Sequence, residues 1–199
     1  MQYKIDFFTY WHTGSGLSAG TAANATVLRN AQGLPYISGK TLKGLLREAG
    51  ETINGFSKEL VSDAFLKDVF GTGQLVLDAK RAELMAAGKA SNSVEEWAVP
   101  TDCFFSNAEL SQNLSEKLKE EAQWLYDTIS STAIESNGIA RENSLRTMEV
   151  TIPLTLFATI ADFPTTANYV EELTNCMKWI KRLGVNRNRG LGRCEWQII

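Results

Sequence analysis

The sequence is poor in the residues that most metal sites and covalent catalytic sites require. Its 199 residues include one histidine, His12, and three widely spaced cysteines, Cys103, Cys176 and Cys194. One histidine excludes a site with two histidine ligands, and cysteines without a CxxC pair do not favour a zinc site or a disulfide framework. Cysteine catalysis would also depend on His12 alone. The composition therefore predicts no metal centre.

Long apolar runs are absent as well. No segment approaches the roughly 20 apolar residues that a membrane helix needs, and the N-terminal MQYKIDFFTY lacks the profile of a signal peptide. A cytoplasmic location without membrane contact is expected. With 44% hydrophobic and 22% charged residues, the chain can bury a globular core. Its length predicts one domain, residues 1–199, with room for an insertion.

Acidic residues are unevenly distributed along the chain. Residues 7–47 contain no Asp or Glu, and residues 177–194 contain six basic residues and no acidic one. The net charge is +4 over residues 1–47, −9 over 48–135 and +2 over 136–199. Such basic clusters indicate a polyanionic partner, with a solvated basic surface as the alternative.

Hydrophobic patterning predicts an α+β chain. Alternation of apolar and polar residues predicts strands, and a 3.6-residue repeat predicts helices. The expected elements are a strand at 2–11, a helix from Gly39 capped by Ser38, a helix around 58–69, a strand at 74–79, a helix at 115–130, one or two strands in 147–161, a helix at 167–183 ended by Gly184, and a C-terminal strand. This order suits a mixed or antiparallel sheet covered by helices on one face.

The helix-start segment, SGKTLKGLLR (residues 38–47), combines a Ser/Gly turn with a basic helix. Free N–H groups, the positive end of the helix dipole and the ammonium groups of Lys40 and Lys43 can together bind a phosphate. A nucleotide-binding P-loop is not expected, because its pattern requires glycine where the chain has Leu34. An ordinary capped surface helix is the alternative.

The Gly/Arg loop, GVNRNRGLGR (residues 184–193), is the second basic segment. Its three glycines let the backbone approach a ligand closely. Its arginines supply forked donors for phosphates, and its asparagines can bond phosphate, ribose or base edges. A basic glycine loop between a helix and a strand is better suited to binding nucleic acid than to holding a fold together.

Two further segments carry weaker signals. Arg141 and Arg146 precede the strands of 147–161, and an ion pair of Arg146 with Glu149 is the alternative to an RNA contact. His12, in WHTGSG, has the chemistry of a general acid or base for RNA cleavage. A lone histidine at the end of a strand is more often a hydrogen-bonding residue of a turn.

These motifs occur in an order that resembles the RAMP superfamily of CRISPR-associated proteins. The chain is most similar to the backbone subunits that coat the crRNA in type III (Csm and Cmr) effector complexes. LPYISGKTLKGLLREA resembles the signature P-Y-I-P-G-S-S-L-K-G-x-L-R, with Ser38 where proline is usual. WHTGSG, VFGTGQLVLDA, ENSLRTMEVTIP and LGVNRNRGLGR resemble the family's first glycine turn, F-G element, L-R-x-x-E-x-V-P segment and C-terminal glycine loop.

The resemblance implies a ferredoxin-like (RRM-like) RAMP fold with a thumb-like insertion at about residues 80–146. It implies binding of crRNA and, through it, target RNA, without sequence preference, beside other CRISPR effector subunits that include copies of the same chain. No cofactor is expected, since only a nuclease would need Mg²⁺. The implied RNA-binding residues are Ser38, Gly39, Lys40, Thr41, Lys43, Arg47, Arg141, Arg146, Asn186, Arg187, Asn188, Arg189 and Arg193.

One departure from the family pattern concerns cleavage. Target-cleaving relatives carry an Asp six residues before the last residue of V-x-R-D. Aligning VLRN with that pattern places Asn24 at the position of the Asp. Because an amide can neither take up a proton nor bind a metal as an anion, the chain is expected to bind RNA without cutting it. The alternative is a RAMP endoribonuclease, acting in target cleavage or crRNA processing.

Overall fold

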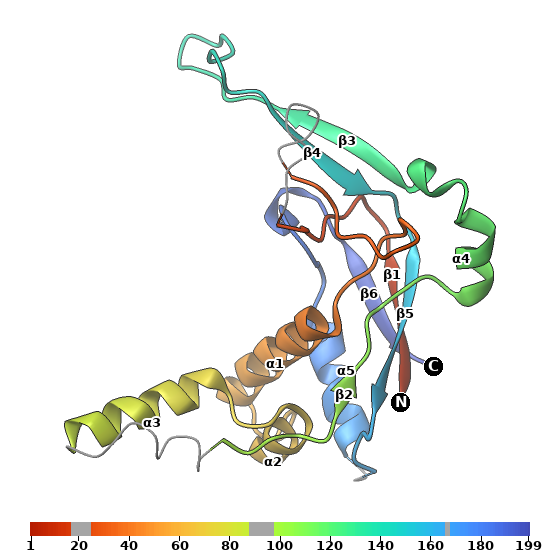
Figure 1. Ribbon diagram of the computed structural model, residues 1–199. Coiled ribbons are helices and arrows are strands. Elements are labelled where there is room, and N and C mark those ends of the chain that lie inside the picture. Colours follow the sequence, from red (N-terminus) through yellow and green to blue (C-terminus); the bar gives the residue numbers. More distant parts are fainter. Residues whose placement is uncertain (17–24, 88–97, 166–167) are drawn as a thin grey trace. The chain divides into compact units, whose positions relative to one another are not determined.

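The computed structural model describes residues 1–16, 25–87, 98–165 and 168–199. The chain forms both helices and antiparallel strands, so the fold is α+β, as predicted (Figure 1). Within the described part of the chain, no helix has both the length and the apolar character needed to cross a membrane.

The described residues divide into two compact units. The helical unit consists of Met1 and residues 39–106 and 159–179. The strand unit consists of residues 2–38, 107–158 and 180–199.

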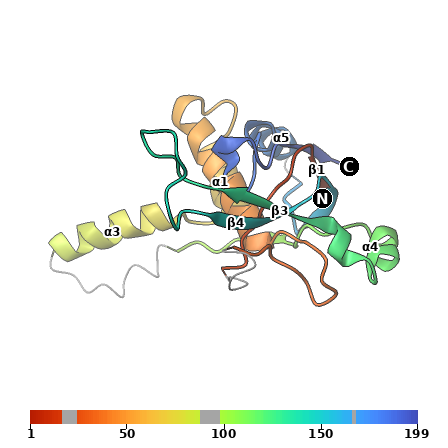
Figure 2. The same ribbon diagram turned by 90° about the horizontal axis from the view of Figure 1, so that it is seen from above.

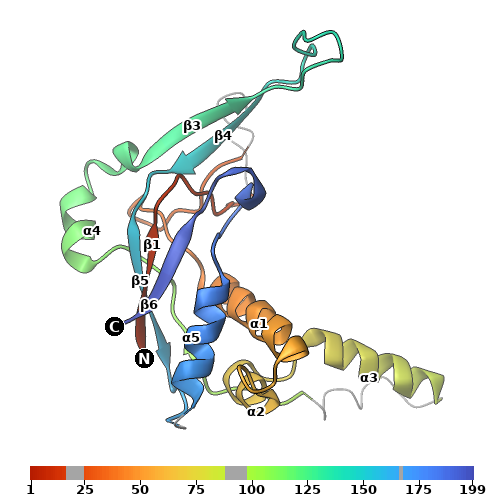
Figure 3. The same cartoon turned by 180° about the vertical axis from the view of Figure 1, so that it is seen from behind.

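Two helices form the core of the helical unit, α1 (Gly39–Phe56) and α5 (Tyr169–Trp179), and they pack side by side (Figure 3). Their buried faces follow the predicted 3.6-residue repeat. The buried apolar residues are Leu42, Leu46, Ala49 and Ile53 of α1 and Tyr169, Leu173, Cys176 and Met177 of α5. A Cβ at Gly50 would lie 3.2 Å from Sγ of Cys176, so this glycine allows the two helices to approach closely.

The helix expected around 58–69 begins later, because Ser62 fixes its start. It consists of α2 (Asp63–Phe65) and η1 (Leu66–Phe70), a π-helix. The Ser62 hydroxyl accepts the N–H of Phe65 at 3.1 Å, as an N-cap does. Glu172 of α5 in turn accepts the backbone N–H of Ser62 at 2.7 Å. The bond to Glu172 attaches the start of the short helices to α5.

The strand expected at residues 74–79 is wrong, because these residues begin α3 (Gln74–Ala86). The strand prediction rested on a short apolar run and ignored the residues after it, DAKRAELMA, which are mostly strong helix formers. Ion pairs between Asp78 and Arg81 and between Lys80 and Glu83, each three residues apart, support the helix further. The helix projects from the rest of the helical unit (Figure 2).

The main sheet has the strand order β2-β5-β1-β6. In the strand unit, β1 (Gln2–Phe7) pairs antiparallel with β6 (Cys194–Ile198), with Tyr3 opposite Ile198. Alternate residues Tyr3, Ile5 and Phe7 are buried, as predicted. Strand β5 (Thr155–Ala161) begins in the strand unit and ends in the helical unit, where it pairs with β2 (Phe104–Phe105).

A second sheet, the hairpin, consists of β3 (Tyr126–Ser131) and β4 (Arg146–Thr151). The helix predicted at 115–130 is therefore wrong over its second half, since α4 spans only Gln112–Leu118 and η3 spans Ala122–Leu125. The apolar repeat had suggested one helix, but α4 buries no residue. Residues 126–131 gain a full ladder of pairs with β4 instead.

Candidate nucleic-acid interface

The helix-start segment, residues 38–47, forms the residue before α1 and the first half of that helix. Gly39 is required there, because a Cβ would lie 2.0 Å from the backbone oxygen of Phe105. Ser38 is half-buried immediately before the helix, and Lys40 and Thr41 are exposed on its first turn. The positive end of the helix dipole and an ammonium group thus lie together, as predicted.

The later basic residues of the helix-start segment are bound by the helical unit. The ammonium group of Lys43 lies 5.8 Å from the ring centre of Phe105, and burial, followed by the charge of Arg47, lowers the pKa of Lys43. The guanidinium group of Arg47 donates to the backbone oxygens of Phe70 and, at 3.0 Å, Gly71. Arg47 therefore caps the end of η1, a contact that the sequence analysis did not anticipate.

The helix predicted at 167–183 ends earlier than expected. Its last residue is Trp179, so Gly184, the first residue of the Gly/Arg loop, is not its cap. The backbone N–H of Leu183 donates to Gly192 at 2.8 Å, so the chain turns back on itself instead of continuing the helix. Gly184 and Gly192 have positive φ, and a Cβ would lie 2.4 Å from the His12 oxygen or 1.9 Å from the Leu183 oxygen, respectively. These two glycines serve the backbone packing of the loop.

The polar side chains of the Gly/Arg loop are at the surface. Residues 187–189 form the 3-10 turn η4 between Asn186 and Gly190, which both have left-handed backbone conformations. All five implied RNA-binding residues of the loop are exposed, namely Asn186, Arg187, Asn188, Arg189 and Arg193. The guanidinium group of Arg193 lies 5.9 Å from the exposed ring of Phe8. The loop thus presents three guanidinium groups to solvent.

His12 is buried, with 1% of its surface exposed. Its Nδ1 lies 2.6 Å from the backbone oxygen of Glu149. Because a carbonyl oxygen can only accept, Nδ1 carries the proton of this bond. The backbone oxygen of His12 accepts the N–H of Val185 at 2.9 Å. His12 therefore connects β4 to the Gly/Arg loop, which matches the hydrogen-bonding role considered for it.

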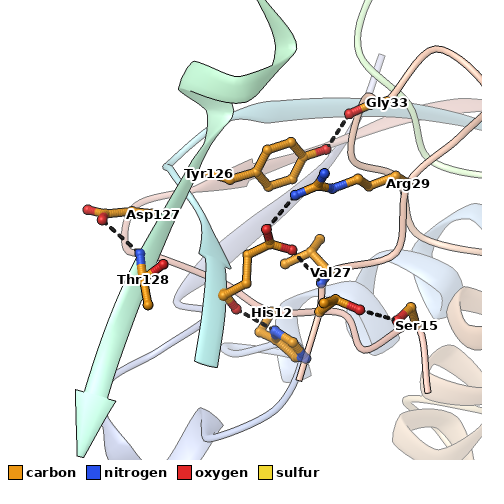
Figure 4. A network of polar contacts seen from close by, with 10 residues as sticks. His12, Ser15, Val27, Arg29, Gly33, Tyr126, Asp127 and Thr128 are labelled. Carbon is orange, nitrogen blue, oxygen red and sulfur yellow. Dashed lines mark hydrogen bonds and ion pairs between the residues drawn. The ribbon is translucent and has the colours of Figure 1, made fainter. Parts of the chain in front are cut away.

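A polar cluster that the sequence analysis missed lies beside His12 (Figure 4). The Glu149 carboxylate pairs with Arg29, not with Arg146, and also accepts the backbone N–H of Val27 at 2.9 Å. The guanidinium group of Arg29 lies 3.8 Å from the ring centre of Tyr126, whose hydroxyl donates to the backbone oxygen of Gly33 at 2.6 Å. Both motifs, VLRN and L-R-x-x-E, were identified in the sequence. The contact between Arg29 and Glu149 was not predicted, because no local pattern indicates a pairing of residues 120 positions apart.

The hairpin carries the remaining implied contacts. Arg146, at the start of β4 and opposite Ser131, is exposed, as is Arg141 in the connection between the strands. Residues 132–145 also hold three exposed apolar side chains, Ile134, Ile139 and Leu145. The hairpin tip thus combines apolar and basic groups.

The implied residues of the Gly/Arg loop and the hairpin belong to the strand unit together with His12, whereas Gly39 to Arg47 belong to the helical unit. Asn24 lies outside the described residues. Among the residues described, no three or more His, Cys, Asp or Glu side chains are grouped so that they could hold a metal ion.

Comparison with known proteins places these observations in a family. A model of the RAMP superfamily matches residues 4–195. No curated protein sequence matches the chain. A chain in the cryo-EM structure of the Type III-B Cmr-beta bound to cognate target RNA has a similar fold, with a TM-score of 0.58 at 12% identity. A chain in the apo-state Type III-B Cmr-beta structure gives a TM-score of 0.59 at 13% identity. Each comparison covers 98% of this chain and 95% of the other, which confirms the predicted fold class.

Proposed function

This chain belongs to the RAMP superfamily, and on that premise we propose that it is a crRNA-binding backbone subunit of a type III-like CRISPR effector complex. It binds RNA phosphates and riboses without reading the base sequence. The observation that carries the proposal is the exposed Gly/Arg loop, whose three guanidinium groups face solvent. The similar structures, Type III-B Cmr-beta with cognate target RNA and in the apo state, are consistent with it.

The Gly/Arg loop supplies the main phosphate contacts. Guanidinium groups bind phosphate oxygens in pairs of hydrogen bonds, and the exposed amides of Asn186 and Asn188 can reach ribose hydroxyls. Because Gly184 and Gly192 are packed against backbone oxygens, the loop is held in shape before RNA arrives. A loop ordered in advance loses less conformational entropy on binding.

The helix-start segment supplies a second, smaller contact. Lys40 and Thr41 are exposed where the N–H groups of α1 begin, and this is the arrangement that binds phosphates at helix N-termini. Ser38 and Gly39 line the same turn. Lys43 adds charge from a half-buried position, while Arg47 shapes the segment by holding η1.

In this proposal the connection between β3 and β4, residues 132–145, serves as the thumb-like part of the insertion predicted at about residues 80–146. Its exposed apolar tip can insert between bases, and Arg141 and Arg146 can hold the adjoining phosphates. Repeated copies of the chain along one RNA would place a hairpin at regular intervals. Such copies associate head to tail, beside other effector subunits, and not as a closed dimer.

RNA remains intact in this proposal. Asn24 replaces the Asp of target-cleaving relatives, and an amide neither accepts a proton nor binds Mg²⁺ as an anion. His12, the other candidate for cleavage, is buried and engaged with Glu149. No cofactor is part of the proposal. An endoribonuclease would use an acidic residue or His12 in a substrate-bound form, and it is the alternative that the experiment tests.

The test is fluorescence anisotropy of a labelled single-stranded RNA at several salt concentrations with Mg²⁺ present, followed by a denaturing gel of the same sample. Salt-sensitive binding of intact RNA, equal for unrelated sequences, is expected, because displaced counterions drive binding. A double variant, Lys40→Glu with Arg189→Glu, should weaken binding to all sequences alike. The control Lys117→Glu changes an exposed lysine of α4 that the proposal does not use.

Two outcomes contradict the proposal in different ways. The two reversals are also made one at a time. If Lys117→Glu weakens binding as much as Lys40→Glu or Arg189→Glu alone, overall charge explains binding and the assigned residues are wrong. If RNA is cut, the alternative function is correct, and His12→Ala then decides whether this histidine takes part.

A further inference from the structure

One residue, Glu149, joins three segments of the strand unit that are far apart in the sequence. Its carboxylate binds Val27 and Arg29, in the segment that leads toward the helix-start segment. Its backbone oxygen accepts from His12, which is itself bonded to Val185 of the Gly/Arg loop. Glu149 is therefore the point at which the WHTGSG, VLRN and L-R-x-x-E motifs meet.

The backbone around Glu149 extends the hairpin by a short third segment. Ala25 and Met148 form a parallel bridge, and the N–H of Glu149 donates to the oxygen of Ala25 at 3.1 Å. The bridge is isolated, and the oxygen of Glu149 accepts from His12. The side-chain carboxylate instead accepts the N–H of Val27. The Glu149 carboxylate thus takes the place of a backbone oxygen as the acceptor for the Val27 N–H.

The same carboxylate immobilises Arg29. The guanidinium group lies between Glu149 and the ring of Tyr126, and the Tyr126 hydroxyl is bonded to Gly33. A hairpin of two strands is by itself marginally stable in water. The backbone of Trp11 pairs with Thr151 at the end of β4 and gives the hairpin one support. The contacts with residues 25–33 give it a second, and these depend on Glu149 or Tyr126.

We propose that Glu149 is a positioning residue for RNA binding, whose carboxylate fixes the hairpin to Val27 and Arg29. The bond from His12 to the backbone oxygen of Glu149, which any residue at this position would keep, joins the same hairpin to the Gly/Arg loop. The inference rests on the proposed function and deepens it. RNA bound by the Gly/Arg loop then meets a hairpin that is already in place, so the second contact forms at high effective concentration. Without Glu149, part of the binding free energy is spent on ordering the hairpin.

The proposal predicts a change opposite to that expected from charge. Glu149→Ala removes one negative charge, which by itself strengthens binding to RNA. Loss of positioning should instead weaken RNA binding several-fold. The matched control, Glu120→Ala, removes the same charge from an exposed residue of the turn after α4 and should leave the affinity equal or slightly higher. Glu149→Gln, which keeps an acceptor for Val27 but loses the ion pair, should lie between Glu149→Ala and the unchanged protein.

Two measurements on the same variants test this. Hydrogen exchange of the RNA-free protein should show faster exchange at Val27 and along β4 in Glu149→Ala but not in Glu120→Ala. Two further substitutions, Ala25→Cys and Met148→Cys, place cysteines at the bridged positions of the Glu149→Ala variant. Oxidation to a disulfide should restore the RNA affinity of this variant, and reduction should lower it again. The native cysteines are free and buried, and burial raises the pKa of Cys194 to about 11 and of Cys176 to about 12, so they do not compete for the new bond.

The outcomes separate this inference from the proposed function. Unchanged or tighter RNA binding by Glu149→Ala, equal to that of Glu120→Ala, overturns the positioning role. So does weakened binding that the disulfide fails to restore, since the effect is then not one of position. If the unchanged protein binds no RNA at all, the proposed function fails, while the exchange at Val27 still reports whether Glu149 holds the segment.

Discussion

In the helix-start segment the basic side chains become more engaged with the protein from one turn to the next, whereas in the Gly/Arg loop they remain exposed. Lys40 is exposed, Lys43 is half-buried over an aromatic ring, and Arg47 caps η1. Arg187 and Arg189 are exposed, in a loop whose backbone is packed at two glycines, Gly184 and Gly192. The two segments have similar basic motifs, so the motif alone does not tell a ligand contact from a structural one.

The largest expected effect separates two glycines of the Gly/Arg loop. In Gly192→Ala the new Cβ meets the Leu183 oxygen at 1.9 Å, so the backbone must move. Gly190, the control, also has positive φ but nothing within 4 Å of its Cβ position. Gly192→Ala should lower the free energy of unfolding by about 3 kcal/mol or more, and Gly190→Ala by about 1 kcal/mol. Urea denaturation measures both, and equal losses would show that the loop is not held by Gly192.

The second prediction tests whether Arg47 is structural. Arg47→Ala leaves the backbone oxygens of Phe70 and Gly71 without their charged donor, and a loss of about 2 kcal/mol in unfolding free energy is expected. Lys40→Ala, at an exposed position of the same helix, should change stability by less than about 0.5 kcal/mol. The same result for both residues would remove the distinction between the turns of α1.

The third prediction concerns a double variant that should change RNA binding but not the stability of the fold. Arg187→Ala with Arg189→Ala should leave the thermal midpoint nearly unchanged, because both side chains are exposed. The dependence of log affinity on log salt should become shallower by roughly 1.4, because each phosphate of a single strand that an arginine neutralises accounts for about 0.7 of the slope. Anisotropy titrations at several salt concentrations measure the slope. An unchanged slope would mean that these arginines do not bind phosphates.

How far the sequence predicts the molecule depends on how local each interaction is. The buried face of α1, one or two strands in 147–161 and a strand at 2–11 were predicted from short-range periodicity. The last of these is observed as the shorter β1, Gln2–Phe7. Residues 74–79 and 126–131 were mispredicted, because a few apolar residues fit either a helix or a strand. For 126–131 the decision comes from pairing with β4, about twenty residues away.

The candidate site shows the same limit. Glycine and arginine content identified the Gly/Arg loop, whose exposure the structure confirms. The cluster of Arg29, Tyr126 and Glu149 could not be found in this way, since each residue has an ordinary local context and the contacts span about a hundred positions or more. Arg47 was grouped with the phosphate contacts for a similar reason. Its partners, Phe70 and Gly71, come from another motif.

The smallest expected effect contrasts the pH responses of the two units. In the strand unit, the N–H of Thr128 and the hydroxyl of Tyr10 donate to Asp127 and lower its pKa. A lowered carboxyl pKa stabilises the fold above the unfolded pKa of about 4, and this stabilisation is lost as the pH falls through the folded pKa. In the helical unit, the lowered pKa of Lys43 acts at the alkaline end, where stability rises as the lysine loses its proton.

Tyr10→Phe tests the acidic half of this contrast. The variant loses one donor to Asp127, so it should be slightly less stable than the unchanged protein at about pH 6, and the difference should vanish as the pH falls below the Asp127 pKa. Urea midpoints between about pH 6 and pH 2.5 measure the difference across that titration. Tyr36→Phe is the control, since its hydroxyl is not among the donors to Asp127. A difference that persists at the lowest pH would show that Tyr10 stabilises the hairpin by packing and not through the charge of Asp127.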